Sequence, residues 1–273
     1  MHVFVVNHRE KVQNPRPTRR LAVVRWLSLA VCLGVLGAGA SGAQAADVRV
    51  AVAANFSAPM QTIARAFEQA TGHKAILSWG STGNLFAQIQ NGAPFDVLLA
   101  ADDETPRKLE HLQWAVAGSR FTYALGRLVL WSRQPGLVDD QAEVLRAGRF
   151  HKIAIANPKL APYGAAAMEV LSTLGLTQTL QPKFVQGDNI AQTYQFVATE
   201  NATLGFVALS QVVAQGRIVA GSAWLVPAHL HTPIRQAAVL LHKGRDNPAA
   251  HALLSYLRSD TAKSIIRAHG YEL

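Results

Sequence analysis

The chain has 273 residues, with 26 lysines and arginines against 17 acidic residues and a formal net charge of +9. This length suits one or two domains with a sizeable hydrophobic core. The basic residues form no continuous run and no stripe interleaved with aromatic residues, so the composition argues against a nucleic-acid partner.

The first 46 residues have the order of a secretory signal peptide. Six basic residues come first, an apolar run spans 26–36, and small residues end in Ala43-Gln44-Ala45, an A-x-A cleavage signal. The apolar run is shorter than the roughly 20 residues that a membrane-spanning helix needs. We therefore expect residues 1–46 to be removed by cleavage between Ala43 and Asp47.

Removal of the leader changes both the charge and the cysteine count. The mature chain keeps 20 basic and 16 acidic residues, a net charge of +4, which suits an anionic ligand through long-range attraction. The only cysteine, Cys32, lies inside the leader. Neither disulfides nor a thiolate metal site can therefore hold the mature fold together.

The mature chain opens with alternating strand and helix patterns. We predict strands at 48–53, 74–78 and 95–100, separated by helices at 58–70 and 84–91, and then a long extended segment at 121–132. Alternation of this kind favours a parallel α/β sheet.

A second α/β set follows the extended segment. Strands are predicted at 152–156, 184–185 and 205–208, with helices at 164–174 and 190–199 between them. Another apolar extended segment at 236–242 leads to helices at 248–257 and 261–269. We expect two α/β lobes joined by two crossover strands, with lobe 1 formed by 47–124 plus 237–273 and lobe 2 by 125–236.

Four short turns, two from each predicted lobe, follow strands and open helices. They are rich in small or neutral polar residues: 53–57, 80–84, 161–164 and 187–190. In open α/β sheets ligands gather beyond the carboxyl ends of the strands. A helix start at that place offers unpaired N–H groups and a partial positive charge to an anion.

The composition of these turns narrows the class of ligand. They supply hydroxyl, amide and backbone donors, no basic residue, and a single acid, Asp188, which we interpret as a helix cap. A metal-cation site would gather His, Asp or Glu, and a carboxylate site commonly uses arginine. Many neutral donors can instead hold a desolvated dianion, each such hydrogen bond contributing roughly 1.5–3 kcal/mol.

Nine short segments, in order along the mature chain, carry a more specific signal. They are 53–56 (AANF), 80–83 (GSTG), 88–97 (QIQNGAPFDV), 100–102 (AAD), 118–121 (GSRF), 126–131 (GRLVLW), 155–158 (IANP), 161–164 (APYG) and 204–208 (LGFVA). Together they resemble the periplasmic molybdate-binding proteins of ABC transporters over nearly the whole mature chain.

The resemblance implies a two-lobed periplasmic-binding-protein fold of type II, a monomer in the periplasm, and a molybdate or tungstate ion held between the lobes for an ABC permease, without a cofactor. Carried over by position, it implies six ligand-binding residues. They are Asn55, Thr82, Tyr163, Ile190 through its backbone N–H, and the flanking Ala54 and Ser81. The preference between molybdate and tungstate stays open.

Three alternatives stay open beside this interpretation. Sulfate- and phosphate-binding proteins share the fold, and selection among oxyanions depends on the volume of the cage. His229 and His231 could form part of a metal-cation site, although no carboxylates lie near them in the sequence. Ser81 or Ser57 could act as the nucleophile of a serine hydrolase, but the G-x-S-x-G pattern is missing. We therefore expect a binding protein and not an enzyme.

Overall fold

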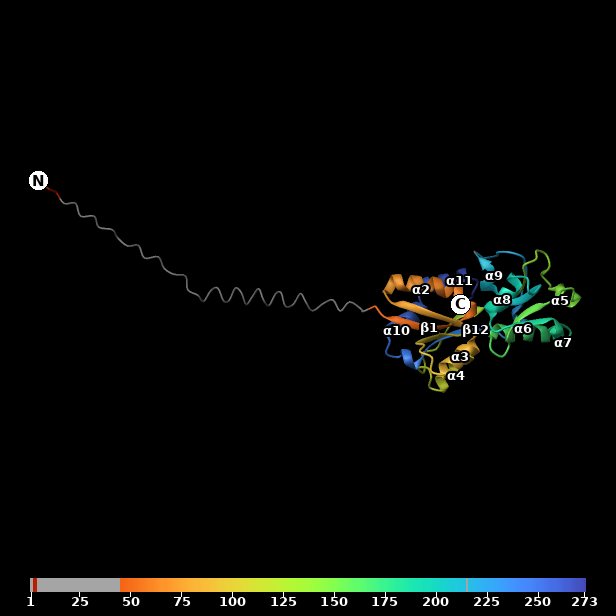
Figure 1. Cartoon of the computed structure of the whole chain (residues 1–273), viewed down its shortest axis with the longest axis horizontal. Helices are drawn as coiled ribbons and strands as arrows, with labels where there is room; N and C mark the ends of the chain where they lie inside the picture. The colour runs from red at the N-terminus through yellow and green to blue at the C-terminus, as the bar shows by residue number, and fades with distance from the viewer. Residues whose placement is uncertain (1, 4–44, 215) are drawn as a thin grey trace. The chain divides into compact units, whose positions relative to one another are not determined.

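The computed structural model describes residues 2–3, 45–214 and 216–273 (Figure 1). The expected signal peptide thus lies almost entirely outside the described residues. Residues 45–273 form one compact unit. Within the described part of the chain, every helix is too short or too polar to cross a bilayer.

The first of two five-stranded sheets has the order β2-β1-β3-β12-β4. Strand β1 pairs in parallel with β2 and β3, while β12 runs antiparallel to both β3 and β4. The bounds are β1 (Asp47–Ala53), β2 (Lys74–Gly80), β3 (Val97–Leu99), β4 (Phe121–Gly126) and β12 (Ile234–Leu240).

Helices cover both faces of this sheet because its buried strands are apolar on both sides. In β1, Val48, Val50 and Val52 belong to the cluster packed by α2, α10 and α11, whereas Ala51 belongs to the cluster packed by α3 and α4. The bounds are α2 (Ser57–Thr71), α3 (Thr82–Gln90), α4 (Glu104–His111), α10 (Pro248–Tyr256) and α11 (Asp260–Ala268), with 3₁₀ turns η1 (Ala54–Phe56) and η4 (His242–Gly244).

The second sheet has the order β11-β5-β8-β6-β7. Strand β6 is parallel to β7 and β8, and β5 is antiparallel to β8 and β11. The bounds are β5 (Leu128–Ser132), β6 (Ile153–Ala156), β7 (Phe184–Gly187), β8 (Leu204–Ala208) and β11 (Ser222–Leu225).

This sheet is also covered on both faces. Ile153 and Ile155 pack in the cluster of α6, and Ala154 packs in the opposite cluster with Val197 of α8. The remaining bounds are α5 (Glu143–Ala147), α6 (Pro162–Thr173), α7 (Thr177–Leu180), α8 (Ile190–Ala198), α9 (Leu209–Val212), η2 (Gln181–Lys183), η3 (Ala228–Leu230) and the small hairpin β9 (Val213–Ala214) and β10 (Arg217–Ile218).

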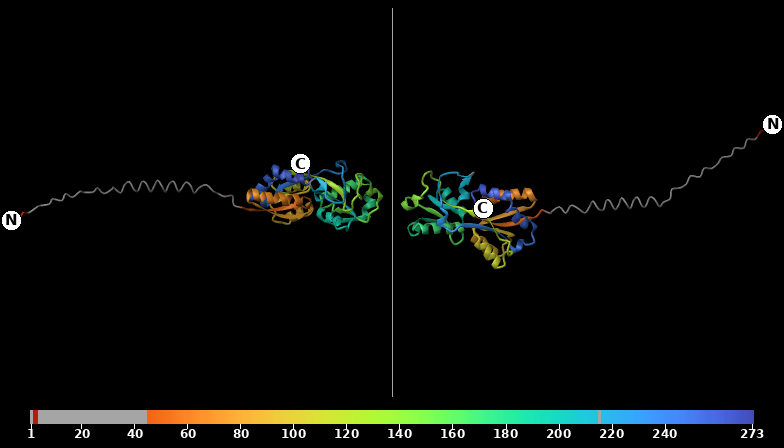
Figure 2. Two further views of the ribbon diagram at one scale, coloured as in Figure 1. Left: turned by 90° about the horizontal axis from the view of Figure 1, so that it is seen from above. Right: turned by 180° about the vertical axis from the view of Figure 1, so that it is seen from behind.

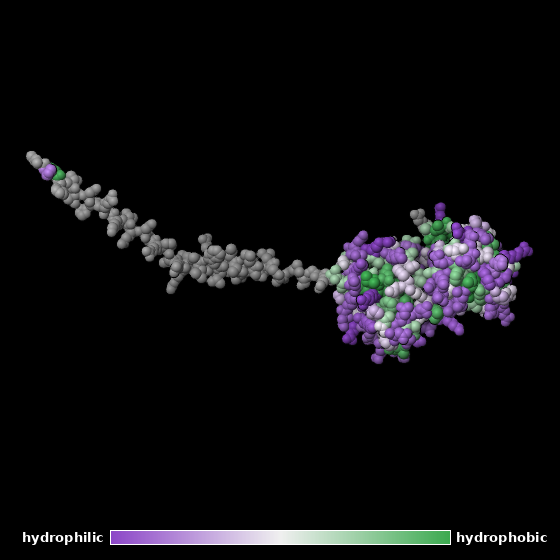
Figure 3. All heavy atoms as spheres, in the orientation of Figure 1, coloured by the Kyte–Doolittle hydropathy of each residue, from purple (hydrophilic) through white to green (hydrophobic). Residues whose placement is uncertain are grey.

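Each sheet with its helices forms one lobe, and the two lobes lie side by side in both views of Figure 2. The C-terminal helices α10 and α11 return to the first sheet, where they contact β1, β12 and α2. The α/β class is therefore confirmed. The exposed side seen in Figure 3 is mostly hydrophilic, with small scattered hydrophobic areas.

The chain crosses between the lobes twice, at neighbouring places. The extended segment predicted at 121–132 is two strands in different sheets, and only Arg127 lies between β4 and β5. The return crossing reaches β12 at Ile234, which pairs with Gly126 of β4. Both places lie within three residues of the lobe boundaries expected from the sequence.

Two helices begin two residues earlier than predicted. Helix α3 starts at Thr82 and not at residue 84, because Ser81 has the extended backbone of an N-cap residue. Helix α6 starts at Pro162 and not at residue 164, because proline is favourable at the first helical position, where no N–H is needed. Both shifts place predicted site residues in the first turn of a helix.

Gly164 sets how closely α6 packs on β6. A Cβ atom at this position would lie 2.2 Å from the carbonyl oxygen of Ala156. We expect Gly164→Ala to lower the free energy of unfolding by about 1–3 kcal/mol, because backbone must shift to admit the methyl group. Urea denaturation measures this change, and Ser172→Ala on the exposed face of the same helix should stay within about 0.5 kcal/mol of the parent. Equal stability of the two variants would contradict the close packing.

Candidate functional site

The four turns predicted from the sequence meet around one small cavity between the lobes. The first lobe contributes Ala53, Ala54 and Asn55 after β1, Gly80, Ser81 and Thr82 after β2, and Ala101 after β3, while the second contributes Ala161, Pro162 and Tyr163 before and in α6 and Asn189 and Ile190 at α8. All six predicted residues line this inner cavity. No lysine, arginine, histidine, aspartate or glutamate is among its lining residues.

Ser81 brings a hydroxyl group that no protein atom uses. Its side chain is 3% exposed, and its Oγ has no hydrogen-bond partner among the described residues. A buried polar group without a partner costs about 1–3 kcal/mol. The hydroxyl is therefore available to a ligand, and a ligand would remove this cost.

Thr82 offers a second hydroxyl donor. Its Oγ1 accepts a hydrogen bond from the N–H of Ala101 at 2.9 Å, which fixes the rotamer. A hydroxyl has one hydrogen and two lone pairs, so accepting this bond leaves its hydrogen to donate. Thr82 is 2% exposed, so the donor is held in a buried place.

Asn55 lies in the cavity wall, but its side-chain amide is committed within the protein. Nδ2 donates to Oε1 of Gln236 at 2.8 Å and to the hydroxyl of Tyr271 at 3.0 Å. Both amide hydrogens are thus used. The donor left to Asn55 for a ligand is its backbone N–H, in the first turn of η1, where no intrahelical carbonyl accepts it.

Tyr163 reaches the cavity from the first turn of α6. Its hydroxyl accepts a hydrogen bond from Nε2 of Gln236 at 3.1 Å, a contact between the two lobes. Burial raises the pKa of Tyr163 and of Tyr123 well above the ordinary value, and raises the pKa of Tyr271 to about 12. These phenols therefore remain protonated donors at neutral pH.

Ile190 contributes through the backbone at the start of α8. The side chain of Asn189 accepts from the N–H groups of Ala191 and Gln192, so the cap leaves the N–H of Ile190 unused. The sequence interpretation of Asp188 as the cap is wrong, because Asn189 holds that position. Ala54, like Ile190, has only its backbone N–H to offer.

A buried network behind the cavity was not predicted. Gln236 is fully buried and accepts from Asn55 and from the hydroxyl of Tyr123 at 2.9 Å. The hydroxyls of Tyr271 and of Ser210 in α9 both lie within hydrogen-bonding distance of the Asn55 carbonyl, at 2.7 and 3.0 Å. One signal could have revealed it, because Gln236 is an uncharged polar residue directly before the apolar run 237–241.

A larger and more open cleft lies outside the inner cavity and shares Ala101, Ala161 and Pro162 with it. Its walls carry both signs of charge, including Asp102 and Lys159. The mixed charges make this outer cleft an entrance with no preference for one sign. At its edge the N–H of Gly83 in α3 donates to the carbonyl of Leu160 at 2.9 Å, a direct contact between the lobes.

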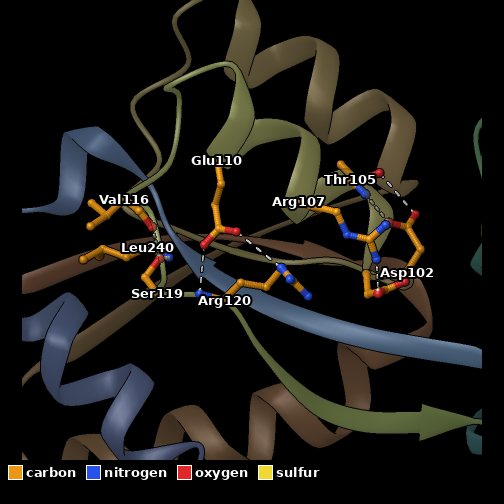
Figure 4. A network of polar contacts seen from close by, with 9 residues as sticks. Asp102, Thr105, Arg107, Glu110, Val116, Ser119, Arg120 and Leu240 are labelled. Carbon is orange, nitrogen blue, oxygen red and sulfur yellow. Dashed lines mark hydrogen bonds and ion pairs between the residues drawn. The ribbon is translucent and has the colours of Figure 1, made fainter.

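Two carboxylates in and just before α4 are held by their own neighbours, as Figure 4 shows. Asp102 accepts from the N–H of Thr105 at 2.7 Å, and burial raises its pKa above the ordinary value. Glu110 accepts from the N–H and Nε of Arg120. These contacts fasten α4 and the segment after it, and neither carboxylate lines the inner cavity.

The geometry does not support the metal or hydrolase alternatives. Among the described residues, no group of three or more histidines, cysteines and acids could hold a metal ion. His231 instead makes a contact of 2.7 Å with the carbonyl of Thr232. A serine nucleophile needs a base within hydrogen-bonding reach, and the hydroxyl of Ser81 has none among these residues.

Comparison with known proteins gives consistent matches. Residues 48–272 match the family model of bacterial extracellular solute-binding proteins. A relative from Azotobacter vinelandii, named molybdate-binding protein ModA, is 60% identical over 248 residues, 90% of this chain and 98% of the relative. A relative of the same name from Rhodobacter capsulatus is 48% identical over 244 residues, 89% and 94% of the two chains.

Among solved structures, the periplasmic molybdate-binding protein of Azotobacter vinelandii matches with a TM-score of 0.80 at 42% identity, over 83% of this chain and 99% of that one. This likeness confirms the predicted two-lobed fold of type II. The relatives carry the names of binding proteins, none the name of an enzyme.

The buried phenols predict how stability depends on pH. Above pH 10 the unfolded chain loses its tyrosine protons while the buried phenols keep theirs, so the free energy of unfolding falls as the pH rises from about 10 toward 12. Tyr271→Phe removes one such group, and we expect it to flatten this slope by up to about 1.4 kcal/mol per pH unit. Urea denaturation from pH 8 to 11.5 measures both slopes, and an unchanged slope in the variant would contradict the assignment.

Proposed function

We propose that this chain, which belongs to the family of bacterial extracellular solute-binding proteins, captures molybdate or tungstate between its lobes and delivers the ion to the permease of an ABC transporter. The names of two of its relatives support the ligand class. The observation that carries the proposal is the unpartnered hydroxyl of Ser81 in a buried cavity with no charged side chain.

Five further donors complete the proposed site. Thr82 offers a hydroxyl hydrogen, and Ala54, Asn55, Tyr163 and Ile190 offer backbone N–H groups, the last two in the first turns of α6 and α8. A dianion accepts hydrogen bonds at all of its oxygens, and hydrogen bonds to a charged group are roughly twice as strong as neutral ones. Hydrogen bonds from the donors of both lobes therefore together replace the hydrogen bonds to water that the ion loses with its hydration shell.

The two lobes suit capture by closure. We place the lobe boundaries where the two sheets divide, with lobe 1 at 47–126 plus 234–273, lobe 2 at 127–233, and the hinge at the two crossings near Arg127 and Ile234. An ion bound by both lobes binds the closed arrangement more tightly than the open one. This difference in affinity sets how far the ion stabilises the closed arrangement. The closed pair of lobes then presents the surface that the permease recognises.

The other functional properties follow from the family and the leader. We infer a monomeric, non-enzymatic protein of the periplasm, which is exported by means of the signal peptide at 1–46. This signal peptide is then cleaved off. Sulfate satisfies the same neutral donors, so exclusion of sulfate depends on cage size. Phosphate carries a proton at neutral pH, and a cage of donors alone offers no acceptor for that proton.

Ser81→Ala tests the site most cleanly, because the hydroxyl of Ser81 has no partner among the described residues and makes no cap hydrogen bond to α3. We expect the variant to bind molybdate about 10- to 100-fold more weakly, the loss of one hydrogen bond to a charged group, with little change in thermal stability. Isothermal calorimetry of the mature protein measures the affinity. The matched control is Ser132→Ala, a buried serine in β5 that donates to the carbonyl of Thr203 and should lose stability while keeping its affinity.

The same titrations with molybdate, tungstate, sulfate and phosphate test the ligand class. Molybdate and tungstate should bind most tightly, because two relatives at 60% and 48% identity are named molybdate-binding proteins. Tighter binding of sulfate or phosphate would contradict the proposed ligand. An unchanged molybdate affinity in Ser81→Ala would contradict the proposed site.

A further inference from the structure

We propose that the backbones of Gly83 and Leu160 form a gate, a contact between the lobes that closes the inner cavity and slows release of the bound ion. The N–H of Gly83 in α3 donates to the carbonyl of Leu160, which precedes α6, at 2.9 Å. The inference rests on the proposed function, in which the inner cavity holds an oxyanion. It assigns a role to two residues that do not themselves line that cavity.

The gate lies where the outer cleft and the inner cavity meet. Gly83 and Leu160 both line the outer cleft. Their chain neighbours Thr82 and Ala161 line the inner cavity. The lobes must therefore part at this contact before an ion passes from the cleft to the cavity or back.

The gate uses a donor that α3 leaves free. Gly83 is the second residue of α3, where the N–H has no acceptor within the helix. A serine at the N-cap commonly accepts such an N–H through its side chain, but Ser81 makes no cap hydrogen bond. The carbonyl of Leu160 takes this place from the other lobe. Closure thus caps α3 and leaves the hydroxyl of Ser81 to the ion.

A tight turn holds the carbonyl of Leu160 in place. The carbonyl of Asn157 accepts from the N–H of Leu160 at 3.1 Å and from the N–H of Ala161 at 2.8 Å. The side chain of Asn157 also accepts from the N–H of Lys159 at 3.0 Å. Because Ala161 is the N-cap residue of α6, the turn is tied to this helix and moves with the second lobe.

Glycine at position 83 lets the two backbones meet. A Cβ atom there would lie 3.0 Å from Cα, 3.0 Å from Cδ2 and 3.2 Å from the carbonyl oxygen of Leu160. Two of these atoms belong to the backbone, so a new rotamer of Leu160 does not make room. The backbone of Gly83 is not in the left-handed region, so the need for glycine is one of space. A methyl group at this position would hold the lobes apart at the gate by a few tenths of an ångström.

The rate of ion release tests the gate. Release of radiolabelled molybdate is timed after an excess of unlabelled molybdate is added to the complex. Gly83→Ala should speed release about three- to tenfold, the value of one hydrogen bond. The association rate should stay within about twofold of the parent, because the gate forms only after the ion has entered. The matched control is Asn84→Ala, the next residue of α3, which lines neither cavity and should release the ion at the parent rate.

A role of Gly83 in the fold alone would give a different result. Alanine has a higher helix propensity than glycine, and opening of the lobes relieves the contact with Leu160. The melting temperature of ligand-free Gly83→Ala should therefore not fall below that of the parent by more than about 2 °C. The rise in melting temperature that molybdate causes should be smaller in the variant, since the variant binds the ion more weakly.

Hydrogen exchange at the amide of Gly83 tests the gate in the unmodified protein. NMR measures the exchange rate with and without saturating molybdate. The ion should slow exchange at least about tenfold, because closure gives this N–H a lasting acceptor. Thr261 holds the same position in α11 and lines neither cavity, so its amide should exchange at one rate in both states.

The outcomes separate this inference from the proposed function. Release at the parent rate in Gly83→Ala, or equal exchange of the Gly83 amide in both states, would overturn the gate while leaving the proposed site intact. Absence of molybdate binding by the parent would overturn both. If Gly83→Ala does not fold, hydrogen exchange in the parent decides alone.

Discussion

The two hydrogen bonds that the side-chain amide of Asn55 donates to Gln236 and Tyr271 organise the site. They join the first turn after β1 to β12 and to the C-terminal segment, and through Gln236 they reach Tyr163 of the other lobe. These hydrogen bonds thereby help to fix the directions of the hydroxyl and backbone donors that line the inner cavity. The family resemblance implies that Asn55 binds the ligand. In the structure its side-chain amide instead holds in place the residues that carry those donors.

A cavity without charged residues follows from this arrangement and suits the proposed ligand. A lysine or arginine would bind many anions with little geometric demand, whereas fixed neutral donors require acceptors at defined places. Helix starts at Thr82, Pro162 and Ile190 add partial positive charge without any ionised side chain. Since donors come from both lobes, an ion in the cavity stabilises the closed arrangement directly.

Local chemistry made part of the molecule predictable from the sequence. Strand and helix periods gave the α/β class, and the small polar turns located all four corners of the cavity. A crossing within 121–132 was expected, but the break at Arg127 was not, because β4 and β5 have the pattern of one apolar extended segment and only their pairing with different sheets separates them. Gln236 was missed because its partner Asn55 lies 181 residues away. Hydrogen bonds over such separations depend on tertiary packing, which no local pattern encodes.

The crystal structure of the molybdate complex tests the neutral-donor cage most directly. The account predicts the ion in the inner cavity, with an oxygen within about 3 Å of the Ser81 hydroxyl, and the Asn55 amide still on Gln236 and Tyr271. An ion seated in the outer cleft beside Lys159, or an Asn55 side chain turned from Gln236 to the ion, would contradict it.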